Sequence, residues 1–183
     1  MDTTLARRFL DASQAYLRGD FLPKIERAVA AMSDDDLWWR PHEEANSAAN
    51  LVLHLAGNVR QWIVAGVGGA PDVRHRAAEF AARDGVSRQE MLARLRASVD
   101  AACDVLAALD PSALAERRQI QAHDVTVMEA IYHVVEHFSM HTGQIIYLAK
   151  LRSGRGMGFY EEAPDGRARL RWKPTPEGPA ERS

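Results

Sequence analysis

Helical periodicity dominates the chain and restricts its fold class. Four segments place apolar residues at intervals of three and four. Before residue 153 no segment shows the sustained alternation of apolar and polar residues that is typical of a strand. The chain has 183 residues, of which 46% are hydrophobic, and this is enough for one compact domain with a real core. The pattern therefore predicts an all-α fold of the four-helix bundle class.

The first two predicted helices are joined and ended by different signals. The first should run from Thr4 to Met32, and Pro23 should kink it or divide it in two. The second should begin at the cap-like pair Asn46 and Ser47 and end at "GVGGAP". The linker "VGGAPDVRHRAAEFAARDG", of roughly twenty residues, is long for a bundle connection. We expect it to cross from one end of the bundle to the other, which favours a non-sequential helix order.

Capping boxes mark the start of the other two predicted helices. Ser87 and Glu90, in "SRQE", open the third helix. Thr126 and Glu129, in "TVME", open the fourth, which should continue to about Lys150.

The composition changes after residue 151, where Gly, Pro and Arg become frequent. In "FYEEAPDGRARLRW" a Pro-Asp-Gly turn separates two short runs, which indicates a small hairpin. We therefore predict a bundle over residues 1–151, a small irregular or hairpin extension packed on it over residues 152–173, and a disordered tail over residues 174–183.

Charge and cysteine usage argue against several classes of protein. The net charge is −2, so no basic field would attract nucleic acid or anionic lipid. No apolar run is long enough to span a membrane, and the N-terminus does not resemble a secretory signal. The single cysteine, Cys103, lies on an apolar stripe and is interpreted as a core residue in a reducing compartment. We expect a soluble, cytoplasmic protein that binds neither nucleic acid nor membrane.

The stretch "HVVEHFSMH" places three histidines at intervals of four in the last predicted helix. Because a metal–nitrogen bond is only about 2.0–2.1 Å long, one ion can be shared by neighbours four apart but hardly by all three. On a helical wheel His141 falls at the edge of the apolar arc, whereas His133 falls outside it and Glu136 lies on the polar face. The wheel therefore selects His137 and His141 as the inward pair.

A third ligand should come from another helix, and His54 in "NLVLHLAGN" is the candidate. Asn50, Asn58 and Gln61 form a polar strip beside it, and Gln144 stands one turn beyond His141, so these four are candidates for outer hydrogen-bond partners or pocket residues. Three protein ligands would leave one coordination position open, which is typical of a catalytic site.

Plainer interpretations of the histidines remain open. His54 alone is compatible with a hydrogen-bonded packing residue, and the spacing of His137 and His141 also recurs by chance. The other four histidines are interpreted as surface or capping residues, namely His42, His75, His123 and His133.

Two segments resemble the signature segments of the DinB-like superfamily of metal-binding four-helix bundles. They are "NLVLHLAGNVRQWI" and "HVVEHFSMHTGQIIYLAKL", and "WWRP" and "GVGGAPDVRHRAAEF" resemble an uncharacterised branch of the same superfamily, so the resemblance covers most of the chain. It implies an up-down-down-up helix order, a metal site made by His54, His137 and His141, and frequent homodimers. Relatives include bacillithiol-dependent and mycothiol-dependent transferases, in which the metal holds a low-molecular-weight thiol as thiolate.

Together the pattern and the resemblance lead to an expected function. It is a metal-dependent thiol transferase that uses zinc, or alternatively nickel, and a low-molecular-weight thiol cosubstrate to modify a small electrophile. Two alternatives are a hydrolase that activates water at the same ion and a non-catalytic dimeric metal-binding bundle. The expected partners are a small-molecule substrate and a second copy of the chain.

Overall fold

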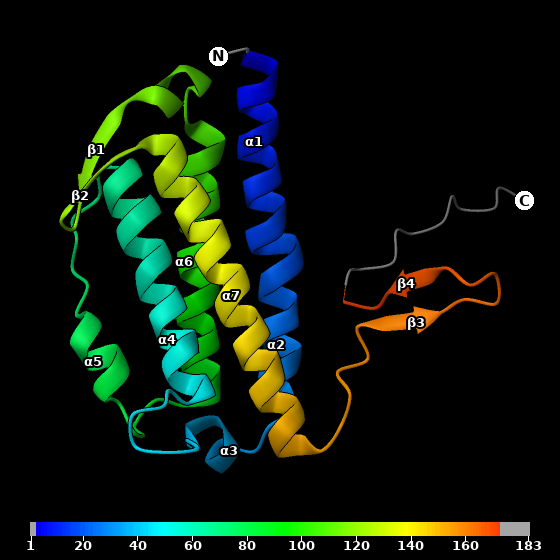
Figure 1. Cartoon of the computed structure of the whole chain (residues 1–183). Helices are drawn as coiled ribbons and strands as arrows, with labels where there is room; N and C mark the ends of the chain where they lie inside the picture. The colour runs from blue at the N-terminus through cyan, green and yellow to red at the C-terminus, as the bar shows by residue number, and fades with distance from the viewer. Residues whose placement is uncertain (1–2, 173–183) are drawn as a thin grey trace, which may run out of the picture.

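Long helices packed side by side form the body of the protein (Figure 1). This computed structural model describes residues 3–172. Its α-helices are α1 (Thr3–Tyr16), α2 (Leu22–Ala30), α3 (Asp34–Trp38), α4 (Ala48–Val59), α5 (Arg76–Ala81), α6 (Arg88–Ala108) and α7 (Val127–Ser153). In Figure 1 the chain runs down α1 and α2, up α4, back to the lower end, up α6 and down α7. The fold is therefore mostly helical, an all-α bundle with small β hairpins attached.

Pro23 divides the predicted first helix, here called the first rod (residues 3–30), but does not end it. It lies in the first turn of α2, and the preceding residues Leu17–Phe21 form a π-helical segment (η1) that links α1 to α2. Proline has no N–H to donate and its ring crowds the carbonyl four residues earlier, so a widened turn at this point accommodates it. Met32, the expected end of the rod, lies just beyond α2 and is buried.

The predicted second helix, here called the second rod, begins at the predicted cap but ends in a segment that the sequence did not indicate. Ser47 is the N-cap of α4, and the reciprocal partner of its capping box is Asn50. After Val59 the rod continues as a π-helical segment, Arg60–Val67 (η2), which was not predicted. The chain then returns to the other end of the bundle over residues 68–87, and this crossover contains the short helix α5 (Figure 1).

A β hairpin between α6 and α7 was missed by the sequence analysis. A 3-10 helix, Pro111–Ala115 (η3), precedes it, and strands β1 (Arg117–Ile120) and β2 (His123–Thr126) pair antiparallel. Each strand has only four residues, too few to show a clear alternation. Its tight turn contains Gln121 at a φ of 55° in place of the glycine or asparagine that marks such turns in a sequence.

The last helix agrees closely with its predicted pattern. Thr126 and Glu129 form the predicted capping box of α7, and Gly154 ends the helix at a φ of 65°, a conformation that glycine adopts without strain. The predicted apolar arc is buried, including Val134, Phe138 and Ile145. Ser87 caps α6 by accepting from the backbone N–H of Glu90, which agrees with the predicted helix start. The other half of the predicted capping box does not form, because the Glu90 carboxylate accepts from Arg94 one turn further along α6.

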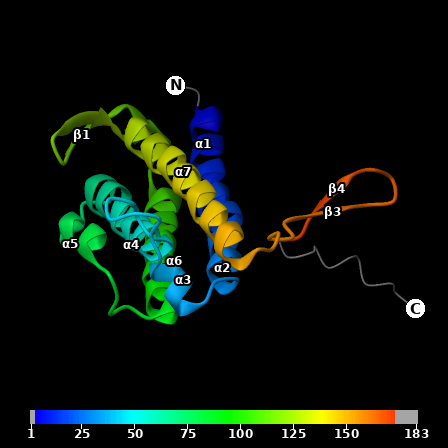
Figure 2. The same cartoon turned by 60° about the horizontal axis from the view of Figure 1, so that its bottom comes forward.

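The chain after α7 forms a hairpin whose base contacts α2. Strands β3 (Tyr160–Glu162) and β4 (Ala168–Leu170) pair antiparallel, as predicted for the extension. The guanidinium of Arg27 donates to the carbonyl oxygens of Gly158 and Arg171, and the ring of Trp172 lies under the Lys24 ammonium. The tip of the hairpin projects away from the bundle (Figures 1 and 2). The predicted tail over residues 174–183 lies outside the described residues.

Two further features concern the core and the surface. Cys103 is buried, and burial raises the pKa of its thiol, so the interpretation as a core residue is confirmed. Within residues 3–172 no helix is long and apolar enough to cross a membrane.

Candidate metal centre

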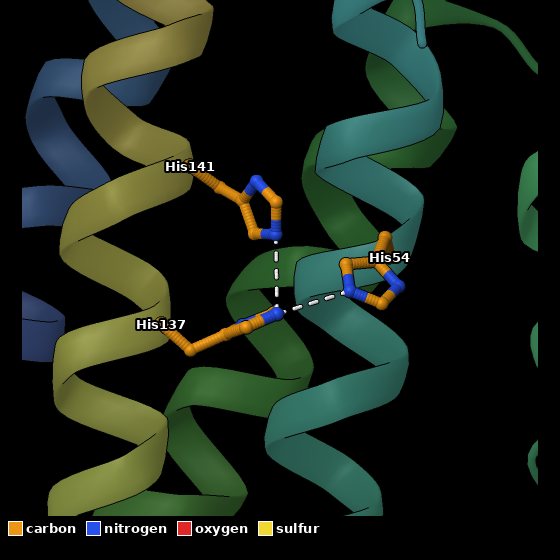
Figure 3. A group of neighbouring side chains, drawn as sticks. All are labelled: His54, His137 and His141. Carbon is orange, nitrogen blue, oxygen red and sulfur yellow. Dashed lines mark hydrogen bonds between the residues drawn. The ribbon is translucent and has the colours of Figure 1, made fainter. Parts of the chain in front are cut away.

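Three histidine rings from two helices converge on one point between α4 and α7 (Figure 3). The Nε2 atom of His137 lies 3.1 Å from Nε2 of His54 and 3.1 Å from Nε2 of His141. His54 and His141 are buried and His137 is partly exposed. The structure thus brings together the three residues that the sequence selected as candidate ligands.

The spacing of these nitrogens suits a small divalent ion. With metal–nitrogen bonds of about 2.0–2.1 Å, two ligand nitrogens lie about 3.3 Å apart in a tetrahedral site. The two separations of 3.1 Å are close to this value, and the three candidate ligand atoms all lie within 4.8 Å of one another. A small movement of the rings would therefore place all three nitrogens at bonding distance from one ion. The group of three histidines can hold a metal ion.

The partners of the other ring nitrogens favour the form of imidazole that binds a metal. Nδ1 of His141 lies 2.6 Å from Oε1 of Gln144, and Nδ1 of His54 lies 3.0 Å from Oε2 of Glu79. Both oxygens accept hydrogen bonds, so each Nδ1 carries the proton and each Nε2 presents a lone pair. Without a metal, the single N–H that a neutral His137 can place on Nε2 satisfies only one of these two lone pairs, whereas a cation between the rings binds both. Hydrogen bonding of this kind is typical of histidine ligands to metals.

His137 is the ring that joins the other two. Its Nδ1 is buried and has no hydrogen-bond partner among the described residues. Burial lowers the pKa of His137 to about 3, and the nearby His141 and His54 act in the same direction. Burial also lowers the pKa of His141, although the bond to Gln144 opposes this. Protons therefore compete weakly with a metal ion for the lone pair of His137 at neutral pH.

The carboxylate of Glu79 was missed by the sequence analysis. Glu79 lies on α5. The guanidinium of Arg74, just before α5, donates two hydrogen bonds to its carboxylate, from Nε to Oε1 and from Nη2 to Oε2, each 2.8 Å long. Burial alone would raise the pKa of Glu79, but the hydrogen bonds from Arg74 and His54 outweigh it and lower that pKa. Arg74 Nη2 also lies 3.0 Å from Nδ1 of His54. Since both groups are donors when Nδ1 is protonated, only the bond to Glu79 forms in that tautomer.

The four candidate polar neighbours occupy different places. Gln144 contacts His141 directly, whereas Gln61 reaches His54 only through Arg74, to which its Oε1 is bonded at 2.8 Å. Asn50 does not contact the histidines, because its side-chain N–H groups donate to the carbonyl oxygens of Glu79 and Ala82. Asn58 is buried, and its Oδ1 has no partner among the described residues.

The remaining histidines lie outside the converging group. His42, His75 and His123 are exposed, as predicted. His133 is partly buried rather than a surface residue, because its ring packs on Trp62 with centroids 4.3 Å apart. The wheel placed it outside the apolar arc of α7 but could not show that η2 covers that side.

The fold and the site define a class of protein, an α-helical bundle in which three histidines between two helices can hold a metal ion. Residues 4–157 match the family described as "Protein of unknown function (DUF1572)", so the chain belongs to this family. The crystal structure of a conserved protein from Enterococcus faecalis is similar, with a TM-score of 0.60 and 20% identity, over 85% of this chain and 99% of that one. At this identity the similarity shows the fold alone. No curated protein matches the chain.

Proposed function

We propose that the protein is a divalent-metal-binding bundle of DinB-like type, with the helix order up-down-down-up, that activates a low-molecular-weight thiol for transfer to a small electrophile. The observation that carries this proposal is the convergence of Nε2 atoms from His54, His137 and His141. Among the described residues these three alone make up the group, so one coordination position stays free for a small molecule. Imidazole ligands suit zinc, and nickel is the alternative.

A divalent ion at this point would lower the pKa of a thiol bound to it, so that the thiol is present as the nucleophilic thiolate. In the transfer, the thiol sulfur forms a bond to the electrophilic carbon, and the leaving group departs with its bonding electrons. The thiol proton goes to solvent. Gln144 and Glu79 hold the rings of His141 and His54 in place during this step.

A cavity beside the site offers space for the small molecules. Its volume is about 460 Å³, and it lies between the start of α4 and the C-terminal half of α7. Gln144, Leu51 and Tyr147 are among its lining residues, so the amide that contacts His141 also faces this space. The protein's own thiol does not compete for the ion, because Cys103 is buried elsewhere in the core.

Two alternatives fit the residues less well. A hydrolase needs a general base near the ion, and Glu79, the carboxylate in contact with the site, is already bonded to Arg74 and His54. A purely structural metal would be needed for folding, but the buried apolar core extends through α1, α4, α6 and α7 without it.

The proposal also places the protein in the cytoplasm as a homodimer. Exposed Tyr147 on α7 supplies apolar surface for such a contact.

The test of this function uses cobalt as a spectroscopic substitute for zinc. Addition of cysteine or glutathione to the cobalt-loaded protein should produce a sulfur-to-cobalt charge-transfer band, and the His141→Ala protein should not show it. The loaded protein should release chloride from an electrophilic organic chloride when the thiol is present. After treatment with a chelator the protein should remain helical but lose this activity. A cobalt spectrum that no thiol changes, or equal chloride release from stripped protein, would exclude the proposed transferase.

A further inference from the structure

The crossover between α4 and α6 holds the group that contacts His54. Its helix α5 has six residues and buries none of them, so it has little stability of its own. It is attached to α4 by polar contacts, in which Asn50 donates to the Glu79 and Ala82 carbonyl oxygens and the Glu79 carboxylate meets His54. The ring of Phe80 on α5 also packs on the His54 ring, with centroids 4.6 Å apart. The position of α5 therefore depends on this ring contact and a few hydrogen bonds, and one of these bonds ends on a candidate metal ligand.

Gly57 allows this close approach. It lies on α4 one turn after His54, and a Cβ atom built on it would come within 2.0 Å of Oε1 of Glu79 and 2.9 Å of Nε of Arg74. Glycine destabilises the interior of a helix. Its presence on α4 is explained by the Glu79 carboxylate and the Arg74 guanidinium, which occupy the space that a Cβ atom would need.

We propose that Glu79 is a positioning residue for the metal site, and that metal binding and docking of residues 74–82 onto α4 stabilise each other. This inference rests on the metal site of the proposed function. Glu79 acts through His54 and does not itself reach the ion.

Two physical effects of Glu79 support the coupling. It accepts the Nδ1–H of His54, which directs the Nε2 lone pair toward His137, and a cation on Nε2 makes that N–H a stronger donor. It also neutralises the buried guanidinium of Arg74, whose Nη2 lies 3.0 Å from the His54 ring and would otherwise repel a metal cation. By thermodynamic linkage, whatever the docked segment adds to metal affinity, the metal adds to docking.

The experiment measures zinc affinity by competition with a chromophoric chelator, together with amide hydrogen exchange of residues 74–82. Glu79→Ala should weaken zinc binding by about 10–100-fold, as loss of an outer partner of a histidine ligand does in other metal sites. Glu79→Gln keeps an acceptor oxygen and should lose less. In the native protein zinc should slow exchange in residues 74–82 by the same factor of about 10–100. In Glu79→Ala this slowing should disappear.

Gly57→Ala tests the same coupling without changing any charge or ligand. Its methyl group should displace Glu79, weaken zinc binding and abolish the slowed exchange. The matched control is Gly143→Ala, because a Cβ atom at this other helical glycine meets nothing within 4 Å. The charge control is Glu136→Gln, an exposed carboxylate next to His137, which should change zinc affinity by no more than about fivefold.

Helical circular dichroism establishes that each variant is folded, and Glu79→Gln replaces the alanine variant if that one does not fold. If the folded Glu79 and Gly57 variants bind zinc with the affinity of the native protein, the proposed coupling is overturned, while the proposed metal site is not. Exchange in residues 74–82 that does not respond to zinc overturns it as well. Absence of zinc binding in the native protein overturns both this proposal and the proposed function.

Discussion

Replacement of His137 by alanine is expected to reduce zinc affinity by at least about 100-fold, because loss of even an outer partner of a ligand costs about 10–100-fold. His137 has the largest expected effect of the three histidines. Its Nε2 is the atom within 3.1 Å of both His54 and His141, which come from different helices. Without this ring only two protein nitrogens, from His54 and His141, remain to bind the ion. Isothermal titration with zinc, or competition with a chelator, measures the change.

The matched control for this variant is His133→Ala. His133 lies four residues before His137 on α7, is also partly buried and packs on Trp62. Its ring lies 5.4 Å from that of His137, centroid to centroid, but it is not part of the converging group. Its replacement should leave zinc affinity within about fivefold of the native value, as expected for a residue with no bond to the ion. A loss of zinc affinity in His133→Ala as large as that in His137→Ala would mean that the ion uses His133 and His137, the other pair in "HVVEHFSMH".

Phe138→Ala is expected to have the largest effect on stability, a loss of about 3–5 kcal/mol in the free energy of unfolding. Phe138 is fully buried, and its ring stacks on Phe21 with centroids 6.0 Å apart. It therefore joins α7 to the π-helical turn before Pro23, where the first rod is divided. Its removal leaves a cavity that the surrounding helices can fill only in part. Urea unfolding, followed by circular dichroism, measures the loss.

Tyr132→Ala is the control on the same helix. Tyr132 is 64% exposed, so its replacement should change the free energy of unfolding by no more than about 0.5 kcal/mol. A loss below about 1 kcal/mol for Phe138→Ala would contradict the packing described, because a fully buried aromatic ring cannot be removed at so small a cost.

The parts of the site on α7 were predictable because they depend on a local rule. The rotation of about 100° per residue places His141 beside Phe138 and Ile145 and turns Glu136 outward, whatever the neighbouring helices do. All of these positions agree with the structure. His54 was predictable for a similar reason, since it lies at the edge of the apolar face of its own helix.

Features that depend on how distant segments meet were not predictable in this way. Glu79 lies in a linker that shows no periodicity, and its role arises only when the crossover returns past His54. The π-helical segment Arg60–Val67 continues the apolar pattern of α4, and its Gly66 does not distinguish a π-helix from an α-helix. The turn at Gln121 carries no proline or glycine that would place it. A buried contact with a linker carboxylate could be suspected only from Gly57, a glycine inside an otherwise strong helix.

The most direct test of the metal site is a crystal structure of the protein grown with zinc, with anomalous diffraction recorded on both sides of the zinc absorption edge. An anomalous peak is expected between α4 and α7, about 2.0–2.1 Å from Nε2 of His54, His137 and His141. The Nδ1 atoms of His54 and His141 should keep their bonds to Glu79 and Gln144. Zinc bound elsewhere, or a His54 ring turned away from the α7 pair, would contradict the account.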